Sequence, residues 1–419
     1  MMRKILKFLL GVVTTLVIKR HRPVIVGVTG SVGKTSTKEA VYEAFKDRKR
    51  IRKSAGNLNT ETGAPLVFLK KDSPGRGLKE WLKIMISGLW LAIKGDKNYP
   101  EIVVVELAAD KPGDIKYLTR FIKPDIAIIT AVGEVPVHVE FYDGPQEVRV
   151  EKEEMLRNAK RNSTAILNID DPYVSEMSFD GRRITFGFSE EADISISNIE
   201  EVSSEGSRIH MIYGGEDFSI FLPLCIGESF AYISGAVFAT GVALSMLPEE
   251  IVKDLQRIRP TKGRLYPVKG KKESVILDGS YNAAPASMES SLGTLQGLPG
   301  KRKVAMLGDM LELGEYSYRE HQRIGEMAGK ICDILVLVGD WAREMKKGAM
   351  NAGMDEENIF VFSNSQEASS EVEELLSPED LILVKGSQGI RMERVILSLM
   401  RDPERAQELL VRQKGEWNS

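Results

Sequence analysis

A glycine-rich loop that runs into lysine and threonine is the first feature of the chain with recognisable chemistry. Residues 24–45 read VIVGVTGSVGKTSTKEAVYEAF, so a β-branched run leads to Gly30 and Gly33 and then to Lys34 and Thr35. In such a loop, backbone N–H groups and the start of the next helix point at a phosphate, the lysine neutralises it and the hydroxyl can bind Mg²⁺. One glycine of the strict Walker A pattern is absent, but strand, glycines, Lys-Thr and helix come in the required order. The predicted phosphate site comprises Thr29, Gly30, Ser31, Gly33, Lys34, Thr35 and Ser36.

Two further side chains are expected beside this loop. Glu106 ends the apolar run IVVVE, and His138 lies on a loop after the run DIAIITAVG. The carboxyl ends of strands in an open α/β sheet face its phosphate crevice, so both side chains should lie there. A single histidine is more often a structural residue. Together with Thr35, however, the two supply oxygen and imidazole ligands for Mg²⁺ beside bound ATP.

The elements that position these residues alternate between strand-like and helix-like segments, which predicts a doubly wound α/β fold with mostly parallel sheets. The first series of strand-like runs comprises VIVGV, EIVVVEL, DIAIITAV and STAILNI, and a β-rich stretch follows from 194 to 224. A second series comprises SVILDGS, KVAMLGD, ILVLVGD, IFVFS and LILVKGS. A helix and linker near Arg259-Pro260 separate the two series. The expected units are therefore 1–22, 23–258 and 259–419.

Composition favours a large enzyme of a reducing compartment. The 419 residues are enough for about two or three domains. A net charge of −3 gives no reason to expect nucleic acid as a partner. The two cysteines, Cys225 and Cys332, lie far apart without metal-ligand spacing, so no disulfide framework is expected. A cytoplasmic monomer is the prediction.

The N-terminal segment leaves two interpretations open. Residues 1–22 contain six lysines and arginines and no acidic residue around an apolar run, which is shorter than the ~20 residues of a membrane-spanning helix. They form either a helix packed on the first domain or an amphipathic anchor on an anionic membrane, at its inner face. The tryptophan-containing segment 77–95, GLKEWLKIMISGLWLAIKG, is either a core-facing helix or an extension of that membrane-facing or partner-facing surface.

Nine stretches carry a family resemblance through their order and spacing. They read TGSVGKTSTKE, GNLNTETGAPL, VVVELAADKPGDIKYLTRFIKPDIAIIT, HVEFYDGPQEVRVEKEEML, LNIDDP, KGRLYPV, DGSYNAAPASM, LGDMLELGEYSYREH and LVKGSQGIRMERV. The chain resembles the Mur ligase family, in particular the branch that adds D-alanyl-D-alanine to a UDP-N-acetylmuramoyl-tripeptide. The resemblance implies a P-loop central domain that binds ATP and a Rossmann-like C-terminal domain that closes over it. It also implies an ATP-dependent amide ligase of peptidoglycan precursor synthesis, which activates a muramoyl-peptide carboxylate as an acyl phosphate before an amine attacks.

The resemblance also implies roles for individual residues. Lys34 would contact the transferring phosphates, and Mg²⁺ would be held by Thr35, Glu106, His138 and Lys152. Lys152 matches a lysine that CO₂ converts to a carbamate in many members; without the resemblance it would be a surface lysine of a charged helix. The implied nucleotide contacts further include Asn168, Asp171, Arg264, Asp278, Tyr281 and Asn282. The implied substrate contacts are Asn57, Asn59, Thr60, Glu61, Lys385, Gly386 and Ser387, and a C-terminal signature contains Asp309, Glu312 and His321.

Departures from the family pattern keep alternatives open. The N-terminal domain that holds the UDP part of the substrate is expected to be missing, because the phosphate loop begins near residue 27. Ala131 replaces a usual Asn, the segment before His138 is two residues longer, GESFAYIS replaces a His-Asn-containing stretch near adenine, and Gly279 and Ala284 alter the DDSYNANP motif. An active ligase would use UDP-muramoyl-peptide or a lipid-linked acceptor and an amino acid or dipeptide. The alternatives are a nucleotide-binding Mur-like scaffold at the membrane and another amide ligase, such as a polyglutamate-type synthase.

Overall fold

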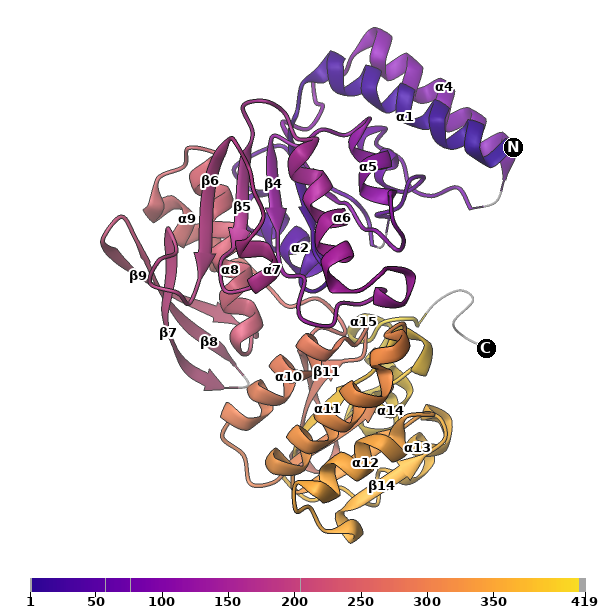
Figure 1. The fold of residues 1–419 in the computed structure, drawn as a ribbon, viewed down its shortest axis with the longest axis vertical. Helices are drawn as coiled ribbons and strands as arrows, with labels where there is room; N and C mark the ends of the chain where they lie inside the picture. The colour runs from indigo at the N-terminus through magenta and orange to yellow at the C-terminus, as the bar shows by residue number, and fades with distance from the viewer. Residues whose placement is uncertain (1, 57, 76, 204, 414–419) are drawn as a thin grey trace.

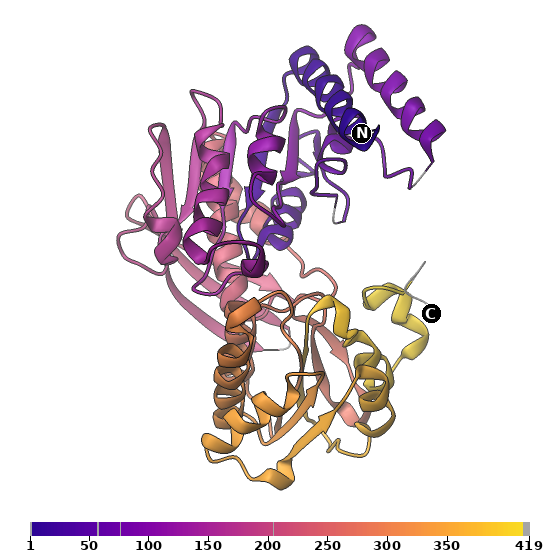
Figure 2. The ribbon, with the colours of Figure 1, turned by 45° about the vertical axis from the view of Figure 1, so that its right-hand side comes forward.

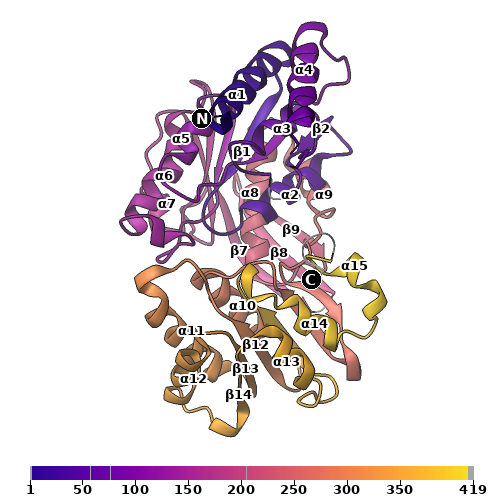
Figure 3. The ribbon, with the colours of Figure 1, turned by 90° about the vertical axis from the view of Figure 1, so that its right-hand side faces the viewer.

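Two mostly parallel sheets, each covered by helices on both faces, form the two halves of the molecule (Figure 1). The computed structural model describes residues 2–56, 58–75, 77–203 and 205–413. We call residues 2–255, with the first sheet, the N-terminal half and residues 263–410, with the second sheet, the C-terminal half. The two halves lie end to end in all three views (Figures 1, 2 and 3).

The first sheet has nine strands and changes direction only at its far edge. In spatial order they are β2 (Ile51–Lys53), β3 (Ile102–Glu106), β1 (Val24–Thr29), β4 (Ile126–Ile129), β5 (Thr164–Asn168), β6 (Arg182–Gly187), β7 (Ile194–Ser203), β8 (Gly206–Tyr213) and β9 (Glu216–Pro223). Pairing is parallel up to β7 and antiparallel from β7 to β9. The four apolar runs and the β-rich stretch are thus confirmed as strands. The short β2 and the arginine-led β6 have no apolar run to predict them.

Helices cover both faces of this sheet because its central strands are apolar on both sides. Val26 and Val28 share a core with α2 (Lys34–Phe45), α8 (Glu228–Ala243) and α9 (Pro248–Leu255). Ile25, Val103 and Val105 face the other way. That second core includes α3 (Ala64–Phe68), α5 (Asp114–Thr119), α6 (Pro145–Arg157) and α7 (Pro172–Ser175).

An outer pair of helices, α1 (Met2–His21) and α4 (Leu78–Lys94), lies at the end of the N-terminal half that points away from the C-terminal half (Figure 3). Leu10, Val13 and Val17 of α1 share a buried cluster with Ile84 of α4. A Cβ atom at Gly88 would lie 2.7 Å from Val13, so the helices approach closely there. The packed-helix interpretation is confirmed for this face of α1. None of the helices in the described ranges is long and apolar enough to cross a membrane.

The second sheet has six strands, of which one runs against the others. In spatial order they are β10 (Tyr266–Lys269), β11 (Val275–Gly279), β15 (Leu381–Lys385), β12 (Lys303–Gly308), β13 (Ile334–Val338) and β14 (Ile359–Phe362). Only β10, which the sequence did not predict, is antiparallel to its neighbour. One face packs α10 (Pro285–Gly297), α11 (Ser317–Ile331) and α12 (Ala342–Asn351). The other packs α13 (Ser365–Glu371), α14 (Glu393–Leu399) and α15 (Ala406–Leu409).

Candidate active site

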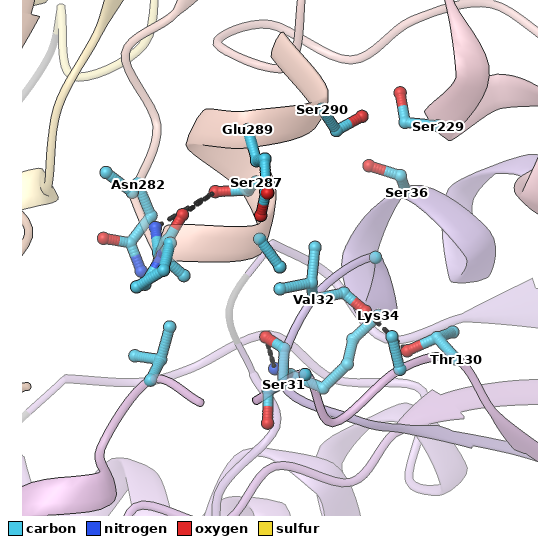
Figure 4. A pocket seen from close by; sticks show the side chains of 18 of the residues that line it. Ser31, Val32, Lys34, Ser36, Thr130, Ser229, Asn282, Ser287, Glu289 and Ser290 are labelled. Atoms are coloured by element: carbon cyan, nitrogen blue, oxygen red, sulfur yellow. Dashed lines mark hydrogen bonds between the residues drawn. The ribbon is translucent and has the colours of Figure 1, made fainter. Parts of the chain in front are cut away.

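A cleft of about 1550 Å³ lies where the two halves meet, and both halves line it. Figure 4 shows Ser31 to Ser36 of the glycine-rich loop on one wall and Asn282 to Ser290, around the start of α10, on the other. Sites for small ligands usually measure about 300–1,000 Å³. The cleft can therefore hold a nucleotide and a second substrate together.

The glycine-rich loop has the backbone that phosphate binding requires. Gly33 has φ 86°, in the left-handed region that glycine adopts at little cost. At Gly30, a Cβ atom would lie 2.2 Å from the Thr130 hydroxyl oxygen. Lys34 Nζ donates to the carbonyl oxygen of Ser31 at 3.0 Å, and burial lowers the pKa of Lys34. Thr29 lies below the loop, where its hydroxyl donates to the Leu107 carbonyl at 2.6 Å.

Thr35, Glu106 and Asn59 form a connected polar group at the base of the cleft. The Thr35 hydroxyl donates to Glu106 Oε2 at 2.8 Å, and Asn59 Nδ2 donates to Oε1 at 2.9 Å. Three segments far apart in the sequence supply these side chains, and all three line the cleft. The predicted proximity of Thr35 and Glu106 is therefore confirmed.

Lys38, which sequence analysis missed, is fully buried beneath this group. Its Nζ donates to the carbonyl oxygens of Ser54 and Gly56, each at 3.0 Å, and lies 3.9 Å from the Glu106 carboxylate. The spacing of Lys38, one helical turn after Lys34, was the available signal. Lys38 ties α2 to the loop that leads to Asn59.

Lys152 is buried on α6, with 3% of its surface exposed, so the surface-lysine interpretation is wrong. Its Nζ lies 3.5 Å from the carbonyl oxygen of Ala109. Burial, with a smaller effect of the nearby Lys34 charge, lowers the pKa of Lys152 to about 7. An amine with this pKa is largely neutral at pH 8.

His138 is paired with acidic residues. Its Nδ1 lies 2.5 Å from Glu312 Oε2 of the C-terminal half, and its Nε2 lies 3.6 Å from Asp110 Oδ1. The hydrogen bond to His138 lowers the pKa of Glu312. Over the described part of the chain, no group of three or more His, Cys, Asp or Glu side chains is arranged to hold a metal. Of the predicted metal ligands, Thr35 and Glu106 are in direct contact, whereas His138 is paired with acidic residues.

The C-terminal half brings four predicted residues to the opposite wall. The Arg264 guanidinium lies 4.3 Å from the centre of the Tyr281 ring, and Lys385 Nζ donates to the Asn282 carbonyl at 2.9 Å. Burial lowers the pKa of Lys385 to about 7. The hydroxyl of Ser387 accepts from the Leu311 backbone N–H at 2.9 Å. Arg264, Asn282, Lys385 and Ser387 all line the cleft.

Several other predicted residues accept hydrogen bonds from backbone N–H groups and so hold loops in place. Asp278 is buried outside the cleft lining, where its carboxylate accepts from the backbone N–H groups of Gly263 and Ser280. Asp171 accepts from four backbone N–H groups, two of which belong to Val132 and Gly133. Asp309 accepts from the backbone of residues 340 and 341, and His321 accepts from that of residue 310.

The polar loop before α3 is divided between the cleft and α1. Asn59 and Thr60 line the cleft, whereas the Glu61 carboxylate lies 2.6 Å from Lys7 Nζ of α1. Asn57 lies outside the described residues. Asn168 and Tyr232 also line the cleft, and the Tyr232 hydroxyl donates to Asp170 at 3.0 Å. The replaced GESFAYIS stretch therefore still borders the cleft.

Comparisons with known proteins point to one family. The model of the Mur ligase middle domain matches residues 84–240, and that of the Mur ligase glutamate ligase domain matches residues 263–388. The UDP-N-acetylmuramoyl-tripeptide–D-alanyl-D-alanine ligase of Bacillus subtilis is 27% identical over 382 residues, which are 90% of this chain and 76% of that protein. The enzyme of the same name from a Synechocystis strain is 29% identical over 388 residues, or 90% and 75%.

Solved structures give the same result. MurF ligase from Thermotoga maritima in complex with ADP matches with a TM-score of 0.78 and 25% identity, over 94% of this chain and 84% of that chain. Folylpolyglutamate synthase of Mycobacterium tuberculosis, at 15% identity and a TM-score of 0.66 over 93% and 95% of the two chains, shares the fold. With both family models matched and the phosphate loop facing the C-terminal half, the chain belongs to the Mur ligase family and has the architecture of an ATP-dependent ligase.

Proposed function

We propose that the protein joins D-alanyl-D-alanine to a UDP-N-acetylmuramoyl-tripeptide, in a cleft between a domain at 23–258 and a domain at 259–419. The observation that carries the proposal is the cleft between the two halves, in which Lys34, Thr35 and Glu106 face Asn282 and Lys385. Relatives at 27% and 29% identity bear the name of this reaction, which supports the same substrates here.

The chemistry couples two transfers. The γ-phosphoryl group of ATP moves to a carboxylate oxygen of the acceptor, and ADP leaves. The amine of the second substrate then attacks the acyl carbon, so that a C–N bond forms, the C–O bond to phosphate breaks and the amine releases a proton. Lys34 neutralises the charge of the transferring phosphoryl group, while the loop N–H groups orient it.

A magnesium ion fits the residues on the nucleotide side of the cleft. The Thr35 hydroxyl and the Glu106 carboxylate lie 2.8 Å apart and supply the oxygen ligands that Mg²⁺ prefers. When bound, the ion would neutralise negative charge on the phosphates. Carbamylated Lys152 is proposed as a further ligand, since its low pKa supplies the neutral amine with which CO₂ reacts. His138 would first have to leave Glu312.

The remaining predicted residues divide between the two substrates. We propose that Asn168, Arg264 and Asn282 contact ATP. We propose that Asn59, Thr60, Lys385 and Ser387 contact the acceptor and the dipeptide, because these side chains line the same cleft.

The test is product formation with purified full-length protein. ATP, Mg²⁺, D-alanyl-D-alanine and UDP-N-acetylmuramoyl-tripeptide should give one phosphate for each amide bond, measured by phosphate release and mass spectrometry. Muramoyl-tripeptides without UDP and muramoyl-tripeptides on a lipid carrier complete the acceptor panel. Nucleotide binding without amide formation for every acceptor and amine would favour the scaffold alternative.

A further inference from the structure

The outward side of α1 and α4 is apolar although it faces solvent. About half of the large hydrophobic side chains that are exposed among the described residues lie on these two helices, which make up less than a tenth of the chain. We call them the α1–α4 face: Ile5, Phe8, Leu9 and Leu16 on α1, and Leu82, Ile86, Leu89, Trp90 and Ile93 on α4. Ile93 is 73% exposed and Ile86 is 59% exposed. Exposed apolar side chains gathered on two packed helices are typical of an interaction site.

The face is held in place by the packing beneath it. The four aliphatic residues of α4, at positions 82, 86, 89 and 93, follow helical spacing and lie along one line of the helix. The other sides of the two helices are closely packed. A Cβ atom at Gly11 would lie 2.6 Å from the Phe121 ring, and one at Gly88 would lie 2.7 Å from Val13. The helices cannot rotate to bury the face without losing these contacts.

Basic side chains surround the face. Helix α1 has no acidic residue in its sequence, and α4 has three lysines against one glutamate, whereas the whole chain has a net charge of −3. Lys19 and Arg20 are exposed at the end of α1, and Lys79, Lys83 and Lys94 are exposed along α4. Positive charge is thus concentrated at one end of an acidic protein.

We propose that the α1–α4 face docks on the surface of an anionic lipid bilayer, with both helices lying in the plane of the interface. Apolar side chains would enter the boundary between headgroups and acyl chains, while the lysines and arginines contact anionic headgroups. Trp90, with Lys94 Nζ 4.4 Å from the centre of its ring, suits the headgroup level, where tryptophan is enriched.

The charge pattern favours lipid over a protein partner. The centres of protein–protein interfaces are depleted of lysine, whereas here Lys79 and Lys83 alternate with Leu82 and Ile86. A lysine beside a lipid interface can extend its ammonium group to the headgroups. The C-terminal half lies away from this end of the molecule, so a docked protein would hold the C-terminal half clear of the membrane (Figure 2). The proposal rests on this surface and not on the proposed reaction.

Flotation with liposomes tests the docking of the full chain. Wild-type protein should float with vesicles that contain about a third phosphatidylglycerol, bind vesicles of phosphatidylcholine less, and release as salt rises above about 0.1 M. The double variant Ile86→Glu and Ile93→Glu should lower vesicle binding at least about tenfold, because two apolar side chains no longer enter the lipid. The matched control, Leu247→Glu with Met350→Glu, places the same charges at exposed apolar positions elsewhere and should bind like wild type.

A charge variant separates the two contributions. Lys79→Glu with Lys83→Glu should remove the preference for anionic vesicles, and thermal melting should show that all variants remain folded. Absence of flotation at every lipid composition, or equal binding by wild type and the Ile86→Glu, Ile93→Glu variant, would overturn the proposal. So would self-association in sedimentation velocity that this variant abolishes without any vesicle binding, because the face would then join two copies of the chain.

Discussion

At the scale of single residues, the phosphate loop makes the most direct prediction. Lys34 has its ammonium group 3.0 Å from a loop carbonyl and takes no part in an apolar core. Lys34→Ala should therefore lower kcat for ligation about a hundredfold or more and leave the melting temperature nearly unchanged, because a transition-state cation is lost. Lys46→Ala, on the exposed end of α2, is the control. Steady-state kinetics with unchanged turnover would rule out the phosphate-loop assignment.

Lys152 is the residue whose environment most alters its chemistry. A buried lysine with a pKa of about 7 is half neutral near that pH, and the neutral fraction rises as the pH increases. A carbamate signal should therefore appear by ¹³C NMR when wild-type protein is given ¹³C-bicarbonate. The signal should grow between about pH 6 and pH 8, where the Lys152 amine loses its proton. It should be absent in Lys152→Ala.

The same variant tests the role of the carbamate in ligation. Lys152→Ala should lower ligase activity at least about tenfold, which is typical for the loss of a group that supports a metal site. A short carboxylic acid in solution should restore part of this activity. Full activity of the variant would exclude this role for Lys152.

At the scale of elements, Lys38 connects α2 to the loop that presents Asn59. Its ammonium group is fully buried and satisfies two carbonyl oxygens, so Lys38→Met would leave both without a donor. We expect a loss of about 1–3 kcal/mol in the free energy of unfolding and faster hydrogen exchange in residues 54–60. Lys46→Met is the control, since the Lys46 ammonium pairs with Glu43 in a more exposed place. Equal hydrogen exchange in residues 54–60 of the two variants would contradict the role of Lys38 in holding this loop.

At the scale of the whole molecule, the two halves are joined beside the cleft by His138 and Glu312. Val135 and Val139 of the N-terminal half also enter the core of the C-terminal half, which supports a closed arrangement. The contact between His138 and Glu312 is partly exposed, with 27% and 43% of the two side chains accessible, so it contributes less than about 1 kcal/mol.

Glu312→Gln should therefore shift the balance toward an open form by up to about fivefold. Because His138 lowers the pKa of Glu312, this contribution is present above the ordinary carboxylate pKa and is lost as the pH falls through the lowered value. Small-angle X-ray scattering should show a larger radius of gyration for Glu312→Gln at neutral pH and a smaller difference from wild type in acid. Glu315→Gln, on the same loop, should match wild type; an identical radius for all three proteins would contradict the closing role.

The sequence by itself determined the apolar strands and the phosphate loop, because apolar runs and glycine spacing act through local backbone geometry. The order and spacing of nine stretches indicated the family, whereas β2, β6 and β10 were not predicted. The predicted proximity of Thr35 and Glu106 also held. Glu106 ends β3, and Thr35 lies in the first turn of the helix that follows the parallel neighbour β1. Only the tertiary structure decided which charged groups are buried and which partners they meet. Lys38 and Lys152 look like ordinary helix-surface lysines until the sheet and loops close over them, and Glu61 meets Lys7 across 54 positions. Such pairings depend on how distant segments pack, and a pattern of neighbouring residues carries no record of that packing.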